Sequence, residues 1–587
     1  MTPRFNAPSS KPLRTPCGIE LHRVKPEFMT LDGNQKVALE MGKTRLLVAG
    51  IVFALAFMVI GGRLIDLAVT DRGNEPKIAG EATSPHLQTG RADIVDRNGV
   101  VLATTLPTAS LYANPKHLKD PEAAARQLAE VLPELERAEL KQKLSSSNSF
   151  VWVKRKLTPK QQYSVNRLGI PGLYFQREFK RFYPHGNLFP HTVGFAGMDN
   201  VGFSGIESAF DDLLRGGNQP LKLSLDIRFQ HALAQELAAA MADFSAIGAA
   251  GIILDARNGE ILALSSLPNF DPNKPAKADD EHRFNRATLG IYEMGSVFKI
   301  FTTAMALDKG YVTLNDGYDT REPIRAARFT IRDYKPKDRW LSIPEIFMYS
   351  SNIGTVHMAM EAGTDVQRSF LRDLGLLRSA SIEINEVGRP ILPSPWREIN
   401  TMTISYGHGL AVSPLHVANA VAAIINGGVK QPTTLLKLNE GERPLGRRVI
   451  SEATSFKMRQ LMRLVVTDGT GSNADAPGYQ IGGKTGTADK LINGRYARDR
   501  RIASFVAGFP MDDPRYVIFA MVDEPKGKKE TFGYATGGWV AAPVIRRVVE
   551  RLGPLLGMEP AAGGDDASQQ LLLRAQAQAE RHQIAAN

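Results

Sequence analysis

Cysteine is almost absent from this sequence of 587 residues, because Cys17 is the only one. A lone cysteine excludes an internal disulfide and any metal site built from several cysteines. A nucleic-acid motif is also lacking. The formal charge of +11 comes from Lys and Arg residues spread along the chain, which fits an anionic membrane or cell-wall surface at least as well as nucleic acid. The length and the 43% hydrophobic content predict two or three globular domains.

Charged residues are missing from residues 46–62, and Leu64 and Ile65 extend the apolar run past Arg63 to about the 20 residues that a membrane span needs. Basic residues outnumber acidic ones in the preceding tail, which keeps the N-terminus in the cytoplasm. The sequence therefore predicts a cytoplasmic tail at residues 1–45 and a transmembrane signal anchor at residues 46–65. A cleaved signal peptide and a buried soluble helix are the alternatives, but the polar tail is too long for a signal peptide.

Residues 66–215 lack any segment that combines an acid, a base and a nucleophile. Residues 91–105 predict a strand, a turn at Asn98-Gly99 and a second strand. The sequence from residue 105 to about residue 147 is typical of helix. We interpret this region as a linker and a non-catalytic pedestal domain.

Residues 216–558 alternate between strand and helix patterns in an order that indicates an α+β domain. The expected strands form an antiparallel sheet of about five, with a largely helical lobe inserted between its two halves. The expected strands are the hairpin of residues 248–267 and the segments 479–487, 502–509 and 516–523, and the expected helices include 227–243, 293–310 and 413–426. Residues 559–587 are rich in Ala, Gln, Gly and Asp, which predicts a loose helix or a flexible tail.

The helix expected at residues 293–310 has almost no polar face, yet it carries Ser296 and Lys299. Three residues of separation place the two side chains on one helical face. A buried lysine with a depressed pKa is able to deprotonate a serine nucleophile, whereas a snorkelling lysine is the structural alternative. No Asp-His pair lies near Ser296 in the sequence, so Lys299 is the adjacent candidate base.

Two other short stretches carry suitable chemistry. Ser350 and Asn352 follow a helical segment and place a hydroxyl and an amide at its end, although a Ser-x-Asn triplet alone means little. Lys484, Thr485, Gly486 and Thr487 end an expected strand, where a lysine and two hydroxyls can hold a carboxylate and the glycine lets a ligand approach the backbone. The structural alternative is an edge strand with a turn.

The order Ser-x-x-Lys, Ser-x-Asn, Lys-Thr-Gly resembles the signature of penicillin-binding proteins and serine β-lactamases. The whole chain from the anchor to about residue 555 is similar to the class B penicillin-binding proteins, and most similar to their division-specific septal branch rather than the elongation branch. The further landmarks of this resemblance are Arg91-Ala-Asp-Ile-Val-Asp-Arg-Asn-Gly99, Gly202-Phe-Ser-Gly-Ile-Glu207, Gly259-Glu-Ile-Leu-Ala263, Ser405-Tyr-Gly-His-Gly409 and Gly478-Tyr-Gln-Ile-Gly-Gly-Lys-Thr-Gly-Thr-Ala488.

The resemblance implies a peptidoglycan D,D-transpeptidase that forms a serine acyl-enzyme and is inhibited by β-lactams. Ser296 would be the nucleophile and Lys299 its base, with Ser350 relaying a proton and Asn352 positioning the stem peptide. Lys484, Thr485 and Thr487 would hold the terminal carboxylate, and the N–H groups of Ser296 and Thr487 would form the oxyanion hole. The resemblance implies no metal and no cofactor.

The resemblance also implies a location and partners. A single-pass protein of the bacterial inner membrane is expected, with its catalytic domain in the periplasm at the division septum. No glycosyltransferase-sized domain precedes the catalytic one, so a membrane glycan polymerase and other divisome proteins are expected partners. The alternatives are an elongation-specific transpeptidase, a D,D-carboxypeptidase, and a β-lactam sensor or scaffold without turnover. A β-lactamase is disfavoured because no Glu-x-x-Leu-Asn loop lies between Asn352 and Lys484.

Overall fold

The computed structural model describes residues 45–62, 90–217, 219–326, 329–439, 441–442, 444–492, 494–561 and 566–586. Residues 1–44 of the predicted tail, residues 63–65 of the predicted anchor, the linker up to residue 89 and Asn493 of a predicted turn lie outside the described residues. The chain divides into two units, Met1–His86 and Leu87–Asn587, and each is described by itself.

In the first unit, one helix spans Arg45–Gly62 with a mean hydropathy of 2.2, and none of its residues is buried. Among the described residues it is the one helix long and apolar enough to cross a membrane. It coincides with the uncharged run that predicts the signal anchor.

The second unit begins with a five-stranded sheet of order β3-β2-β1-β5, in which β4 also pairs with β2. The strands are β1 (Ile94–Val95), β2 (Val101–Ala113), β3 (Val151–Leu157), β4 (Leu173–Phe182) and β5 (Leu221–Lys222), and the helices between them are α2 (Pro121–Val131), α3 (Arg137–Leu144) and α4 (Pro159–Asn166). The predicted turn at Asn98-Gly99 joins β1 to β2. However, β2 continues to Ala113, where helix was expected, because it pairs with β4 along Thr104 to Ala113.

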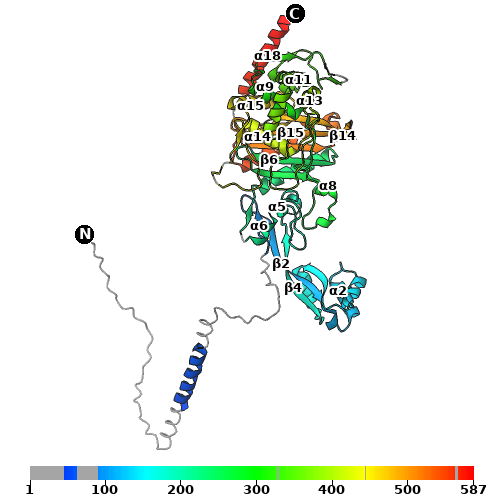
Figure 1. The fold of residues 1–587 in the computed structure, drawn as a ribbon, viewed down its shortest axis with the longest axis vertical. Coiled ribbons are helices and arrows are strands. Elements are labelled where there is room, and N and C mark those ends of the chain that lie inside the picture. Colours follow the sequence, from blue (N-terminus) through cyan, green and yellow to red (C-terminus); the bar gives the residue numbers. More distant parts are fainter. Residues whose placement is uncertain are drawn as a thin grey trace, which may run out of the picture. The chain divides into compact units, whose positions relative to one another are not determined.

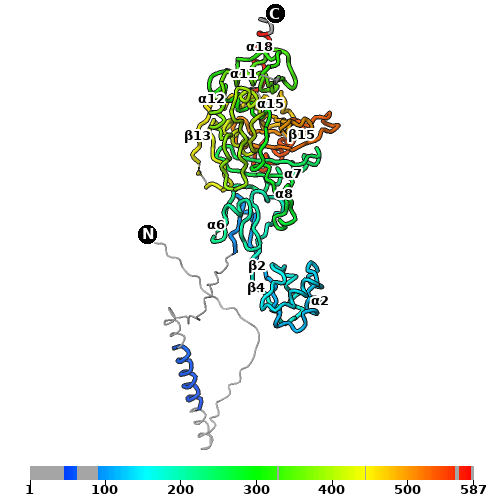
Figure 2. Tube along the Cα trace, turned by 45° about the vertical axis from the view of Figure 1, so that its right-hand side comes forward, coloured from blue at the N-terminus to red at the C-terminus, as the bar shows by residue number. Residues whose placement is uncertain are grey.

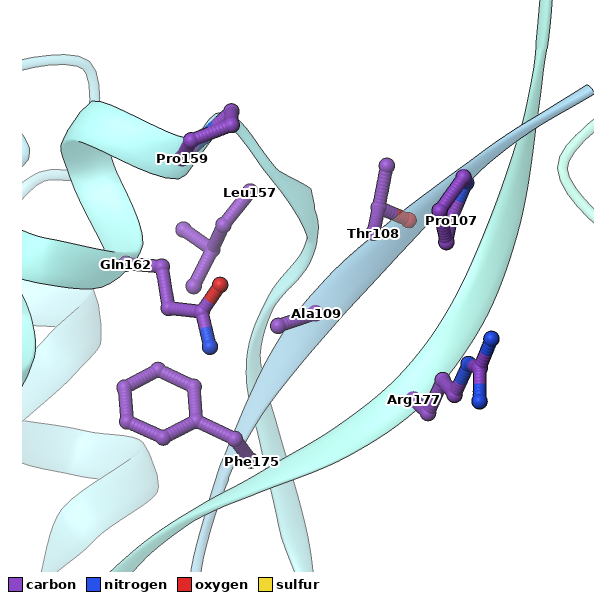
Figure 3. A pocket seen from close by; sticks show the side chains of 8 residues that line it. All are labelled: Pro107, Thr108, Ala109, Leu157, Pro159, Gln162, Phe175 and Arg177. Carbon is purple, nitrogen blue, oxygen red and sulfur yellow. The ribbon is translucent and has the colours of Figure 1, made fainter. Parts of the chain in front are cut away.

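A separate core lies beneath the far end of this sheet, where Leu111, Leu128 and Leu157 are buried together. A cavity of about 360 Å³ opens beside it, and Figure 3 shows Gln162 and Phe175 on one side with Pro107 and Thr108 on the other. The residues that line the cavity do not combine an acid, a base and a nucleophile.

Residues from both ends of this pedestal meet at Glu207, whose side chain is fully buried. Its carboxylate accepts from Nε of Arg91 and from Nε of Arg181 at 2.6 Å, and the Tyr183 hydroxyl donates to it at 3.2 Å. Arg91 also pairs with Asp211 at 2.6 Å. Two sequence landmarks far apart in the chain, at Arg91 and Glu207, are therefore one buried ionic network that joins α5 (Gly205–Ala209) and α6 (Asp211–Gly216) to the sheet.

The second sheet is antiparallel, with the order β14-β15-β16-β6-β7. Its strands are β6 (Gly248–Asp255), β7 (Ile261–Leu267), β14 (Gly482–Ile492), β15 (Arg495–Phe509) and β16 (Tyr516–Asp523), which confirms the predicted five-stranded α+β domain. Strands β6, β7 and β16 are buried along their whole length. Helices cover both faces, as Figure 1 shows, which explains why these strands are largely apolar in sequence.

The two faces carry different helices. Helices α7 (Ile227–Asp243), α16 (Gly537–Val540) and α17 (Ala542–Leu555) belong to one layer, and α9 (Lys299–Asp308), α14 (Pro414–Ile425) and α15 (Glu452–Thr467) belong to the other. The inserted lobe adds α8 (Asp280–Arg283), α10 (Ile343–Tyr349), α11 (Asn352–Ala362), α12 (Thr364–Asp373) and α13 (Glu398–Ser405). It also holds the short pairs β8 (Gly317–Asp319) with β11 (Trp340–Ser342), β9 (Ile324–Ala326) with β10 (Phe329–Ile331), and β12 (Val429–Lys430) with β13 (Arg447–Arg448).

Residues 566–586, where a loose helix or a flexible tail was expected, form helix α18 (Asp566–Ala586). This helix contacts α15, β11 and α10, and its Ala575 is 1% exposed. The His582 ring stacks on Trp340 with a centroid distance of 4.1 Å.

Candidate active site

Ser296 and Lys299 lie where a short 3₁₀ turn, η4 (Gly295–Phe298), passes into α9. A continuous helix from residue 293 was expected, but the first turn is tighter than an α-helix. Residues three apart eclipse each other in a 3₁₀ turn, so Ser296 and Lys299 still share one side of it. Ser296 is partly exposed, whereas α9 is buried at every position from Lys299 to Leu307, which confirms the predicted burial.

The Lys299 ammonium reaches the next element. Its Nζ donates to the backbone oxygen of Ser350, to Oγ of Ser350 at 3.0 Å and to Oδ1 of Asn352 at 2.7 Å. In the described part of the chain, the Ser296 hydroxyl makes no hydrogen bond, so no such bond joins it to Lys299. Lys299 is 0% exposed, and burial followed by the nearby charge of Lys484 holds its pKa well below the usual range.

Ser350 ends α10 in a left-handed conformation with φ of 62°, which is costly for a serine and typical of functional positions. Asn352 begins α11 immediately after it. The carboxylate of Asp333 fixes this junction, because it accepts from the backbone N–H of Asn352, from the N–H of Ile353 at 3.0 Å and from the Ser351 hydroxyl at 2.7 Å. Sequence reasoning missed Asp333, and no local motif marks it.

Lys484 comes from β14, the edge strand of the five-stranded sheet. Its Nζ donates to Oγ of Ser350 at 3.0 Å and to Oγ1 of Thr485 at 3.4 Å. Thr485 Oγ1 also lies 3.0 Å from Oγ1 of Thr470, a second residue that the sequence did not indicate. Burial lowers the pKa of Lys484 to about 7.

Glycines let the backbone of η4 approach β14 closely. A Cβ on Gly295, which has φ of 54°, would overlap the carbonyl oxygen of Thr487, and a Cβ on Gly407 would overlap the carbonyl oxygen of Gly295. The N–H and C=O of one residue in an antiparallel strand point to the same edge, so the N–H of Thr487 also faces η4 rather than β15. Gly486 packs as tightly, because a Cβ there would lie 2.6 Å from the Met294 carbonyl oxygen.

Glu293 holds the surroundings of this turn together. Its Oε1 accepts from the N–H of Gly409 at 2.8 Å and from the Tyr496 hydroxyl at 3.2 Å. Tyr496 belongs to the β14–β15 hairpin, and burial raises the pKa of the Glu293 carboxyl. One side chain therefore ties the hairpin and the Ser405-to-Gly409 segment to the start of η4.

The site is therefore a narrow meeting point of three elements. Lys299 donates to Ser350 and Asn352, and Lys484 donates to Ser350. Thr487 adjoins Gly295 through the backbone. Among the described residues, no group of three or more His, Cys, Asp or Glu is arranged to hold a metal. The chemistry that this set of groups can perform is nucleophilic attack by a hydroxyl, assisted by amines whose pKa values are lowered.

Two family profiles match the chain. The penicillin-binding protein transpeptidase domain matches residues 249–550, and the penicillin-binding protein dimerisation domain matches residues 86–226.

Relatives and solved structures are similar over most of the chain. A protein of Caulobacter vibrioides named probable peptidoglycan D,D-transpeptidase FtsI is 40% identical over 80% of this chain and 82% of its own length. The peptidoglycan D,D-transpeptidase FtsI of Escherichia coli is 28% identical over 88% of this chain and 92% of its own length. Penicillin-binding protein 3 of Mycobacterium tuberculosis, crystallised with aztreonam, superposes with a TM-score of 0.65 at 24% identity, covering 81% of this chain and 98% of that one, and shows the shared fold.

Proposed function

The chain belongs to the penicillin-binding protein transpeptidase family, and we propose that it is the division-specific peptidoglycan D,D-transpeptidase of its cell, working through a serine acyl-enzyme. It cross-links stem peptides in the septal wall, and β-lactams acylate the same serine. The assignment of residues rests on one observation: Lys299, which follows directly on the turn that carries Ser296, bonds to Ser350 and Asn352, and Lys484 bonds to the same Ser350 hydroxyl.

The acylation step follows from these contacts. Neutral Lys299 takes the proton of Ser296, whose oxygen bonds to the carbonyl carbon of the penultimate D-alanine. The C–N bond to the last D-alanine breaks, and the Ser350 hydroxyl, hydrogen-bonded to both lysines, passes a proton to the leaving amine. The N–H groups of Ser296 and Thr487 stabilise the oxyanion, at about 3 kcal/mol for each donor.

Substrate binding uses the same cluster. The Asn352 amide orients the donor peptide, while Lys484, Thr485 and Thr487 bind the terminal carboxylate. Gly486 lets β14 pack directly against Met294 and so keeps these residues beside η4. An amine of a neighbouring stem peptide then attacks the ester, forms the cross-link and releases Ser296.

The membrane arrangement supports this role. The helix Arg45–Gly62, the one helix among the described residues that is long and apolar enough to span, anchors the protein in the inner membrane, with residues 1–44 in the cytoplasm and the second unit in the periplasm at the septum. Glycan strands come from a membrane glycan polymerase that works with this protein alongside other divisome components.

Labelling with a fluorescent penicillin tests the residue assignment. The full-length protein in detergent becomes labelled, Ser296→Ala abolishes the label, and Ser164→Ala in α4 leaves it unchanged. Mass spectrometry of the digest places the adduct on the peptide that contains Ser296. A label that survives in Ser296→Ala refutes the assignment.

Depletion of the protein in its own host tests the septal role. Filaments support division-specific cross-linking, because growth along the cell continues without septation. Rounded cells instead assign the protein to elongation.

A further inference from the structure

A second cavity, of about 480 Å³, lies in the transpeptidase domain away from the serine site. It is bounded by the end of α12 and the loop after it, the first turns of α14 and the β12–β13 pair. Figure 2 shows α12 and β13 on the opposite side of this domain from β15, whose hairpin with β14 borders the serine site.

Positive charge dominates this cavity. Arg378, Lys430 and Arg447 line it, and Asp373 is the one carboxylate among its lining residues. Asp373 pairs with Arg447, whereas Arg378 and Lys430 form no ion pair within the described residues. His416 adds no charge, because burial lowers its pKa and its Nδ1 accepts a hydrogen bond from the N–H of Ser413. The lining therefore carries a net charge of +2, from three cations and one carboxylate.

Lys430 is the most confined of the three cations. Its side chain lies across Gly375, where a Cβ would come within 2.9 Å of Cε and 3.0 Å of Nζ. Burial, then the charges of Arg378 and Arg447, lower the pKa of Lys430. A half-buried ammonium without a counter-charge is costly, and an anion in the cavity removes that cost.

Neutral hydrogen-bonding groups complete the lining. Ser379, Asn419 and Thr433 face the cavity, whose volume exceeds that of a single small ion. We propose that this cavity is a second ligand site that binds an oxyanion group carrying at least two negative charges, either a phosphate or a set of carboxylates. The inference rests on the proposed function only where it names the origin of the ligand. Peptidoglycan stem peptides carry carboxylates, and the lipid-linked precursors carry a diphosphate.

Isothermal titration of the full-length protein in detergent tests the proposal, with inorganic pyrophosphate and citrate as separate probes at about 0.15 M salt. We expect saturable binding of at least one probe, weakened at least fivefold by Lys430→Gln and by Arg378→Gln. Arg368→Gln is the matched control, because Arg368 is an exposed cation on α12 that does not line the cavity.

The two probes separate the possible sources. Binding of pyrophosphate alone assigns the site to a phosphate ligand, and binding of citrate with equal or greater affinity assigns it to a carboxylate ligand. The absence of saturable binding, or unchanged affinity in the Lys430→Gln/Arg378→Gln double variant, overturns the proposal. Penicillin labelling of the same samples keeps this test separate from the proposed function, because the label reports on Ser296 and not on this cavity.

Discussion

Lys299 and Lys484 donate to the same atom, since each Nζ lies 3.0 Å from Oγ of Ser350. Two ammonium groups that share one acceptor in a buried site repel each other, and burial disfavours both charges. Burial and the charge of Lys484 hold the pKa of Lys299 well below its usual range, and burial lowers the pKa of Lys484 to about 7. A neutral amine is thus available near neutral pH as a base for Ser296.

The charge of Lys484 sets the pH at which acylation begins. Acylation requires neutral Lys299, so its rate rises with pH through the pKa of Lys299. Lys484→Met removes a charge that lowers this pKa, so the pKa rises and the midpoint moves to higher pH. Stopped-flow acylation by a chromogenic β-lactam from pH 5 to 10 measures the midpoint. Lys526→Met, at an exposed lysine, is the control, and an unmoved midpoint in Lys484→Met contradicts the coupling.

Asp333 acts on the same lysine with the opposite sign. Its charge raises the pKa of Lys299, and its carboxylate holds the junction between Ser351 and Ile353. Asp333→Asn is expected to move the acylation midpoint to lower pH and to reduce the maximum rate about tenfold, because Asn352 is held less firmly. Asp338→Asn, at an exposed site nearby, changes neither value. A reduced rate with an unmoved midpoint leaves Asp333 with a structural role only.

The contact between η4 and β14 is testable with two glycines. Gly295→Ala and Gly310→Ala both place an alanine at positive φ, at 54° and 75°. Only the first new Cβ meets backbone, because nothing lies within 4 Å of the position at Gly310. We expect Gly295→Ala to slow penicillin acylation by about 100-fold, since displacing η4 from Thr487 opens the oxyanion hole, and Gly310→Ala to leave the rate nearly unchanged. Equal effects of the two variants mean that backbone strain, rather than this contact, is responsible.

The sequence predicted the sheet because buried strands and tight turns leave local signals. Strands β6, β7 and β16 are largely apolar and buried along their length, and Asn258-Gly259 marks a hairpin. It also pointed to the three reactive stretches, because each one is a short motif whose polar residues lie next to one another in the sequence. The role of Asp333 could not be predicted from the sequence, because it depends on where a loop folds relative to α11. The long strand β2 was missed for a similar reason, as its pairing partner β4 lies about 60 residues later in the chain.

Helix α18 was read as loose because its composition is Ala- and Gln-rich, with few large apolar residues. Its packing relies on small side chains instead. Ala575 is 1% exposed, so the backbone of α18 lies close to its neighbours, and Gln578 donates to the backbone oxygen of Asn315 at 2.9 Å.

The contacts of α18 with α10 predict that the C-terminal helix stabilises the element that ends at Ser350. Removal of residues 562–587 is expected to lower the melting temperature by about 3 °C or more, since 1 kcal/mol corresponds to about 2–4 °C in a domain of this size. Ala575→Arg produces the same effect by overfilling a buried site. Leu573→Arg is the matched control, because Leu573 is 65% exposed on the same helix. Differential scanning fluorimetry measures all three, and equal melting temperatures for Ala575→Arg and Leu573→Arg contradict a stabilising role for the helix.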